Sequence, residues 1–194
     1  MYLLRISFYL CMLGCITLTS SCTSMGGLQG SDDWSVVPKS YIDGLTAARD
    51  GKPKQAIKLF ASTINTHPDF SPAYVNIGLQ QLNLKQFEAA EKNLKKSIEI
   101  NPENPVSFHY LGVIARFKGD FGAAKTRYLK AIDLNPDYAI AHLNLGILCD
   151  LYLYDLDQAL EHYEKYQSLL DKKDAKVTKW IIDIKRRITK GKKS

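Results

Sequence analysis

The histidines and cysteines are the residues of this 194-residue chain whose chemistry could support catalysis or metal binding. They are not arranged for either task, because the sequence contains no HExxH, GxSxG or CxxC motif and no phosphate-binding GxxxxGKS or GxxxxGKT loop. His67 precedes a proline in a polar turn and is predicted to be exposed, whereas His142 and Cys149 are predicted to pack in a core. His162 is the neighbour of Tyr163, which is expected to fill the space between two helices. His109 falls on a helix face that could touch a ligand. We therefore expect a protein that is not an enzyme and uses no metal or cofactor.

Cys22 is the cysteine with the most informative surroundings. It follows a short start that ends at Arg5, an apolar stretch over residues 6–18, and small polar residues at 19–21. About 13 apolar residues are too few to cross roughly 30 Å of hydrocarbon, but they are typical of a signal-peptide core. The segment resembles a bacterial lipoprotein leader. That resemblance implies removal of a signal peptide, residues 1–21, and attachment of lipid to the sulfur of Cys22.

Alternatives to this assignment stay open. Thr19 stands where such leaders usually carry leucine, Cys15 offers a second cleavage point, and the leader could be cleaved without lipid or retained as an anchor. The resemblance also implies that Thr23, directly after the lipidated cysteine, directs the protein to the outer membrane, facing the periplasm. Residues 22–36, the lipidated cysteine and a segment rich in Gly and Ser, are predicted to form a flexible tether. Cys149 then has no partner, so no intrachain disulfide is expected.

A period of 34 residues organises the rest of the chain. Glycine, alanine, proline and large apolar residues each recur at this interval, which is a strong signal of internal repeats. The recurring residues are Gly44, Gly78, Gly112 and Gly146, then Ala56, Ala90 and Ala124, then Pro68, Pro102 and Pro136, and finally Phe60, Leu94 and Tyr128. The period and pattern resemble the tetratricopeptide repeat, a helix-turn-helix unit. The resemblance implies an all-α, right-handed solenoid of four repeats, at residues 37–70, 71–104, 105–138 and 139–173.

Packing explains why these residue types recur. The glycine in the first helix of a repeat and the alanine in the second let the two helices approach closely, and the large residue fills the gap between them. Proline ends the second helix because it lacks an N–H group and restricts its predecessor. Ser71 and Asn104, each followed by proline, are predicted to cap the next first helices. Gly51 and Gly119 are predicted in the turns inside repeats.

The terminal parts of the solenoid depart from the pattern. The first repeat has polar residues such as Ser40 where apolar ones are usual, as expected for an end repeat with one solvated face. In the fourth repeat the small residue, Ala159, comes one position late, which predicts a one-residue insertion within residues 151–157. An amphipathic helix over residues 174–189 is predicted to cap the solenoid, followed by a basic tail, residues 190–194. An interfacial membrane helix is the alternative, because basic residues flank its apolar face.

The net charge of +6 is concentrated at the C-terminus. Residues 172–194 contain ten Lys or Arg and two Asp, so the rest of the chain is slightly acidic. A solenoid body without a net positive field is not expected to bind nucleic acid. The hydrophobic share of 45% and the charged share of 24% exclude a disordered polymer and a polytopic membrane protein.

The resemblance also implies a binding surface, because tetratricopeptide repeats present a concave face lined by five positions of each first helix. We call the residues at these positions the predicted groove: Tyr41, Leu45, Val75, Leu79, Leu82, His109, Val113, Arg116, Phe117, Leu143, Ile147, Asp150 and Leu151. The asparagines that the chaperone-binding subclass uses to hold an acidic C-terminus are absent. A largely apolar groove favours a hydrophobic helix or extended segment of a protein partner and no small-molecule substrate. Coverage of part of the groove by the chain's own termini is the alternative.

Two functional classes follow. The first is a non-enzymatic, membrane-anchored scaffold for protein–protein interaction in the bacterial cell envelope. Residues 142–153, 159–166 and 177–181 look like parts of bacterial repeat proteins described as components of TonB-type systems, which implies an accessory role in such a transport system. The second is a pilotin-like factor for type IV pilus or secretin assembly, because pilotins are also lipoproteins built from tetratricopeptide repeats. Pilotins usually carry more repeats than the four found here.

Overall fold

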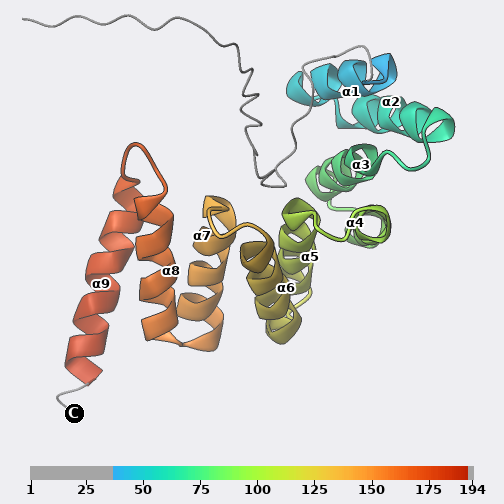
Figure 1. Cartoon of the computed structure of the whole chain (residues 1–194). Coiled ribbons are helices and arrows are strands. Elements are labelled where there is room, and N and C mark those ends of the chain that lie inside the picture. Colours follow the sequence, from blue (N-terminus) through green and yellow to red (C-terminus); the bar gives the residue numbers. More distant parts are fainter. Residues whose placement is uncertain (1–36, 192–194) are drawn as a thin grey trace, which may run out of the picture. The chain divides into compact units, whose positions relative to one another are not determined.

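Helices and short turns make up all of residues 37–191, the part of the chain that the computed structural model describes (Figure 1). These residues contain nine α-helices and one π-helix and no strand, which confirms the predicted all-α class. The signal peptide 1–21, Cys22 and the tether to residue 36 lie outside the described residues, as do residues 192–194 of the basic tail. The elements are α1 Lys39–Arg49, α2 Pro53–Thr66, α3 Ser71–Asn83, α4 Phe87–Ile100, α5 Pro105–Phe117, α6 Phe121–Leu134, α7 Ala139–Leu148, η2 Cys149–Leu153, α8 Leu156–Ser168 and α9 Ala175–Gly191.

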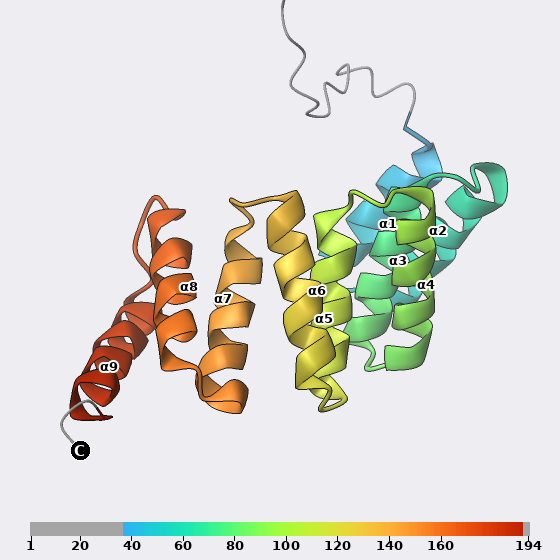
Figure 2. The ribbon, with the colours of Figure 1, turned by 60° about the horizontal axis from the view of Figure 1, so that its bottom comes forward.

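The helices pack in sequence order, each against the one before it. Figure 2 shows α5, α6, α7 and α8 side by side in that order, with α9 beyond α8. Residues 37–191 all belong to one compact unit. Its core is a chain of local clusters, each shared by neighbouring helices, and the largest joins α6 to α9. This arrangement is a helical solenoid, in which each repeat is stabilised by its neighbours.

Side-chain caps begin several of the helices. The Asn104 side chain accepts hydrogen bonds from the backbone N–H groups of Val106 and Ser107, at 3.0 and 3.3 Å. Asp120 and Asp155 accept equivalent bonds at the starts of α6 and α8. These bonds satisfy donors that a helix leaves free in its first turn, which favours a helix start there. The predicted cap at Asn104 is therefore confirmed.

The predicted cap at Ser71 is wrong. Ser71 is the first residue of α3, and its hydroxyl donates to the carbonyl oxygen of Ser97 at 3.1 Å instead of bonding to its own helix. The Ser97 hydroxyl in turn contacts that of Ser107 at the start of α5. All three side chains are buried, so this hydroxyl chain joins three helices from two neighbouring repeats.

A glycine in the first helix of each repeat lies against a large, fully buried side chain of the second. A Cβ atom added to Gly112 would come within 2.7 Å of two ring carbons of Tyr128. The same relation joins Gly44 to Phe60, at 2.6 Å. In the fourth repeat the partner of the glycine is Tyr163, which shows that the pairing persists across the insertion. At these distances an added Cβ atom would overlap the ring, so only glycine fits at this position without a shift of the two helices.

The turn inside each repeat needs one residue with a left-handed backbone. Gly51 and Gly119 supply it with φ of 70° and 79°. Lys85 and Tyr154 occupy the same place in the second and fourth repeats, with φ of 58° and 55°. A non-glycine residue has a steric cost of roughly 1–2 kcal/mol there, because its Cβ approaches the carbonyl oxygen.

The extra residue of the fourth repeat is accommodated in the π-helix η2, residues Cys149–Leu153. The second helices α2, α4 and α6 begin at intervals of 34 residues, whereas α8 begins one residue later. A π-helix absorbs one additional residue without breaking the helix, because its hydrogen bonds span five residues. The Tyr154 backbone then reverses the chain into α8.

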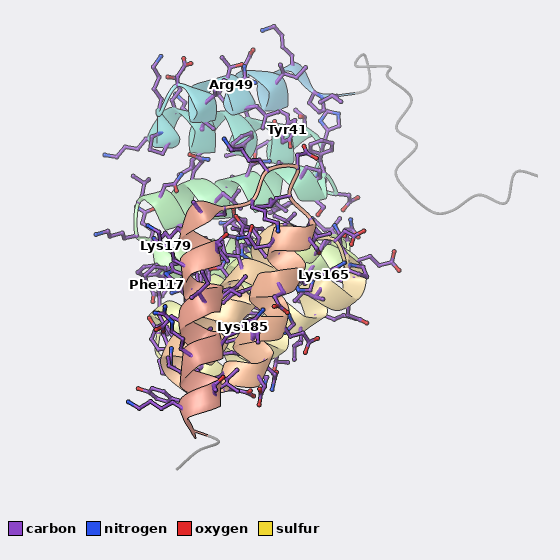
Figure 3. All side chains as sticks on the ribbon, turned by 90° about the vertical axis from the view of Figure 1, so that its left-hand side faces the viewer. Tyr41, Arg49, Phe117, Lys165, Lys179 and Lys185 are labelled. Carbon is purple, nitrogen blue, oxygen red and sulfur yellow. The ribbon has the colours of Figure 1, made fainter. Side chains whose placement is uncertain are left out.

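The helix α9 covers the last repeat with its apolar face. Val177 and Ile184 are fully buried in a cluster with Tyr163 of α8, and the Trp180 ring lies 5.4 Å from the Tyr163 ring. Figure 3 shows α9 beside α8 from outside the end of the solenoid, with Lys185 labelled on α9. An apolar face that is buried against protein is not available to a membrane. Within residues 37–191, no helix is both long and apolar enough to cross a bilayer.

Candidate protein-binding surface

The predicted groove is distributed along the first helices of the four repeats. Its members lie on α1, α3, α5 and α7, except Asp150 and Leu151, which lie on η2. Phe117 and Leu151 are the well-exposed members, with 63% and 57% of their surface accessible. Eight members are half-buried: Tyr41, Leu45, Leu79, Leu82, Val113, Arg116, Leu143 and Ile147. Val75, His109 and Asp150 are buried, so these three side chains support the surface from beneath instead of offering area to a partner.

Two of the predicted residues tie adjacent first helices together. The Tyr41 hydroxyl accepts a hydrogen bond from the Asn76 amide at 2.9 Å. Two repeats further along, the Asn144 amide donates to Nε2 of His109, also at 2.9 Å. Each asparagine also donates to the carbonyl oxygen four residues earlier in its own helix, which holds the amide in place. Sequence reasoning did not assign these asparagines, although both follow a predicted groove position by one repeat and one residue.

His109 is enclosed by aromatic rings. Tyr110, Tyr128 and Tyr138 lie 4.7, 5.7 and 5.4 Å from it between ring centres. Burial, with a smaller contribution from the positive charge of Arg116, lowers the pKa of His109 to about 4. The imidazole is therefore neutral at physiological pH.

Asp150 is bound by the chain itself. Its Oδ1 accepts a hydrogen bond from the Arg187 guanidinium of α9 at 2.6 Å. The Asp150 side chain is only 10% exposed. The ion pair attaches the C-terminal helix to the predicted groove at the end formed by the last repeat. The C-terminal helix thus contacts one end of the predicted groove through Asp150.

Aromatic side chains gather where first helices end and second helices begin. The Phe87 and Phe117 rings lie 5.3 Å apart, and those of Phe121 and Tyr152 lie 4.5 Å apart. Tyr154, in the next turn, is 78% exposed. Sequence reasoning assigned only Phe117 to the surface. The signal for the others was available, because Phe87 and Phe121 are separated by the repeat period.

The remaining histidines and the free cysteine are in structural positions. His67 is exposed, as predicted. His142 and His162 are buried, and their Nδ1 atoms lie 3.1 Å apart. Since Nε2 of His142 faces the Pro136 carbonyl oxygen at 3.0 Å, it is the donor there, and its Nδ1 accepts from His162.

Burial also governs the reactivity of these groups. It lowers the pKa of His162, assisted by the neighbouring His142. Burial raises the pKa of the Cys149 thiol to about 11, so the thiol stays protonated and packs as a small apolar group. No group of three metal-ligating side chains occurs in the described part of the chain.

Comparison with known proteins agrees with this architecture. Residues 71–104 match the family model described as Tetratricopeptide repeat, and residues 116–148 match another described as TPR repeat. No curated protein matches the chain. The repeats and the helical structure together show that the chain contains tetratricopeptide repeats and folds as a solenoid of this type. Proteins built from these repeats generally mediate protein–protein interaction and are generally not enzymes.

Three solved structures illustrate the similarity in fold. A MamA protein is 25% identical, with 66% of this chain and 70% of that chain covered and a TM-score of 0.57. Pseudomonas aeruginosa PilF is 19% identical over 78% of this chain and 68% of that chain, with a TM-score of 0.69. A thermophilic TPR protein of Thermus thermophilus is 21% identical over 77% of this chain and 81% of that chain, with a TM-score of 0.63. At 19% and 21% identity, the last two show the fold alone.

Proposed function

We propose that this protein is a non-enzymatic scaffold of the bacterial cell envelope, anchored by lipid at Cys22, that binds a protein partner through the first helices of its repeats. The observation that supports the binding role is that large apolar side chains are exposed to solvent, although other large apolar side chains of the solenoid are buried in its core. Phe117, Leu151 and Tyr154 are all more than half exposed. Phe117 and Leu151 occupy the same position of neighbouring repeats, and exposed apolar side chains on successive repeats are what a docking surface requires.

The chemistry of the surface supports a peptide as the bound partner. The exposed side chains are apolar or aromatic, and Arg116 stacks on Phe117 at 5.3 Å from the ring centre. Aromatic residues and arginine are the types that contribute most binding energy at protein interfaces. An apolar helix or extended segment would bury this surface.

An accessory role in a TonB-type transport system is our preferred assignment within this class. It is supported by the likeness of residues 142–153, 159–166 and 177–181 to repeat proteins of such systems. A pilotin-like role in pilus or secretin assembly is the second candidate. The PilF structure supports it through its fold and its coverage of this chain.

Substitution of Phe117 by Asp tests the binding role. Leu79 and Val113 are half-buried and pack against core clusters, so a charge there would also disturb the fold. Phe117→Asp changes an exposed side chain, and Leu129→Asp is the matched control, because Leu129 is 42% exposed on the second helix of the same repeat. We expect partner capture from solubilised envelopes to be lost with Phe117→Asp and kept with Leu129→Asp. Equal capture by both variants, with unchanged circular dichroism, would contradict the proposal.

The same capture experiment separates the two roles. Recovery of transport-motor subunits supports the TonB-type assignment, whereas recovery of a secretin without them supports the pilotin-like one. The anchor is tested separately by treating cells with globomycin. We expect an unprocessed precursor to accumulate and the Cys22→Ser variant to lose its lipid; an unchanged mature mass would refute the lipid assignment.

A further inference from the structure

The outer face of α9 carries a row of positive charges. Lys179, Arg186 and Lys190 are exposed and follow one another by seven and four residues, so they lie along one side of this helix. Arg186 comes two positions after the buried Ile184, which places it about 200° around the helix axis from that residue. Lys179 has the same relation to the buried Val177. We call these three cations the basic stripe; it lies opposite the face that packs against the solenoid.

The basic stripe is open to solvent. The helix α9 packs against α8 and is the last helix of the row in Figures 1 and 2. Ile182, which lies between Lys179 and Arg186 in the sequence, is 49% exposed. This exposure shows that no other part of residues 37–191 covers the outer side of α9.

The charges of the basic stripe are not neutralised by the rest of the described chain. Lys185, on one flank of α9, pairs with Glu164 at 2.7 Å. Arg187, on the other flank, pairs with Asp150 and Asp183. The other basic residues of α9 and of the turn before it form no ion pair with a described residue: Lys172, Lys173, Lys176, Lys179, Arg186 and Lys190.

A lipid surface is the partner that these observations favour. Anionic headgroups attract clustered lysine and arginine side chains through charge alone, without a fixed geometry of donors. The side chains of the basic stripe are long and exposed, and a helix with such a basic face is typical of contact with a membrane surface. The chain before residue 172 is slightly acidic, so α9 marks the end of the solenoid that an anionic surface attracts.

We propose that the outer face of α9 lies on the anionic phosphate headgroups of the membrane to which Cys22 anchors the chain. This inference rests on the lipid anchor of the proposed function, because an attached lipid keeps the headgroups at a high local concentration around the domain. The contact is electrostatic, and Val177 and Ile184 stay packed against the solenoid. It thus differs from insertion of an interfacial helix, which would have to expose that apolar face.

A second attachment would restrict the orientation of the solenoid. The lipid holds the chain ahead of the first repeat, and α9 follows the last one. Contact at both positions limits rotation of the domain about its tether. The predicted groove would then face its partner in a narrower range of directions than the tether alone allows.

Sedimentation with lipid vesicles tests the inference. A chain that begins at residue 23 retains the whole compact unit but carries no lipid, so any binding comes from the protein itself. We expect binding to vesicles that contain phosphatidylglycerol and no binding to vesicles of phosphatidylcholine alone. Raising the salt from about 0.1 M to about 1 M should release the chain, because the screening length falls from about 10 Å to about 3 Å.

A pair of double variants locates the contact. Each basic residue near an anionic surface strengthens binding about fivefold, so Arg186→Gln with Lys190→Gln should weaken vesicle binding about tenfold or more. Lys54→Gln with Lys58→Gln is the matched control, because these exposed lysines are also four residues apart on one helix, α2, and form no ion pair with a described residue. The two variants have the same net charge. Weaker binding of the first alone would place the contact on α9.

Trp180 distinguishes surface contact from insertion. Its ring lies 5.4 Å from that of Tyr163 in α8, and in a Trp34→Phe variant it is the single tryptophan of the chain. Lipids brominated in their acyl chains quench a tryptophan that enters the hydrocarbon. We expect binding without such quenching. Quenching would show that α9 leaves α8 and enters the bilayer, which would overturn the proposed contact.

Other outcomes would also overturn it: no binding to phosphatidylglycerol vesicles, equal binding to neutral ones, or equal weakening by the two double variants. If Arg186→Gln with Lys190→Gln abolishes protein capture from solubilised envelopes but leaves vesicle binding unchanged, the basic stripe binds an acidic protein and the lipid contact is wrong. Failure of the anchor is distinguishable, because it appears in the globomycin experiment and does not affect vesicle binding by a chain without lipid.

Discussion

Substitution of Gly112 by alanine tests whether close approach of two helices sets the repeat. The added Cβ atom would lie 2.7 Å from Cδ1 and Cε1 of Tyr128, well inside van der Waals contact. The ring cannot retreat into solvent, because Tyr128 is fully buried. Overpacking of this kind costs about 1–3 kcal/mol, and a contact this short against a rigid ring falls near the upper end. Alanine recovers about 1 kcal/mol of helix propensity, so we expect a net loss of about 2 kcal/mol.

The same repeat contains a matched control. Gly122 lies exposed in the first turn of α6, and the nearest atom to a Cβ added there is Oδ1 of Asp120, at 3.8 Å. Gly122→Ala should therefore gain up to about 1 kcal/mol. Urea unfolding followed by circular dichroism measures both variants. Amide hydrogen exchange in α5 localises the effect, because repeat arrays open repeat by repeat.

A double substitution identifies the cause. With Tyr128→Leu, the third repeat acquires the residue that the second repeat has at this place, and the cost of Gly112→Ala should fall because a leucine can change rotamer more easily than a ring can move. The reasoning is refuted if Gly112→Ala is as stable as Gly122→Ala, or if its cost is the same with leucine as with tyrosine at position 128.

Three further predictions concern the C-terminal helix and pH. Ile184→Ala should cost about 2–5 kcal/mol, since this side chain is fully buried, whereas Ile182→Ala on the 49%-exposed side should cost little; similar urea midpoints would contradict the capping role of α9. Arg187→Ala should destabilise the chain more than Asp150→Ala, because the carboxylate is nearly buried and the guanidinium is 40% exposed and can turn to water; the reverse order of thermal unfolding temperatures would refute this. Burial lowers the pKa of His109 from 6.5 to about 4, so the unfolded chain binds more protons between these values. The contribution of His109 to the free energy of unfolding should therefore fall by up to about 3 kcal/mol as the pH drops from 6.5 to 4. His109→Gln should make the slope smaller in urea titrations, and part of the slope should remain because burial also lowers the pKa of His162.

The repeat framework could be predicted because it rests on contacts between residues near each other in sequence. Gly112 and Tyr128 belong to one helix pair, and the same pairing recurs in the first repeat, between Gly44 and Phe60. The late position of Ala159 likewise indicated an extra residue, which the structure places in η2. Every repeat needs the same close contact between its two helices, so the residues that form this contact recur at the repeat period.

Contacts between different helices explain what the sequence did not show. Ser71 resembled a helix cap, but its hydroxyl bonds to Ser97 of the helix that follows α3. His109 occupied a groove position, but Asn144 and Tyr138 of the neighbouring segment enclose it. Each residue was assigned from its own position in the repeat. Its burial, however, depends on side chains of other helices, which occupy different positions in their repeats.

The sequence by itself determined the all-α class and indicated an extra residue between the two helices of the fourth repeat, since these follow from spacing and residue type along the chain. Only the tertiary structure decided which groove residues are exposed and that α9 neutralises Asp150 through Arg187. The physical reason is that exposure and hydrogen-bond satisfaction depend on every neighbour in space. Repeat position specifies only the direction in which a side chain leaves its own helix.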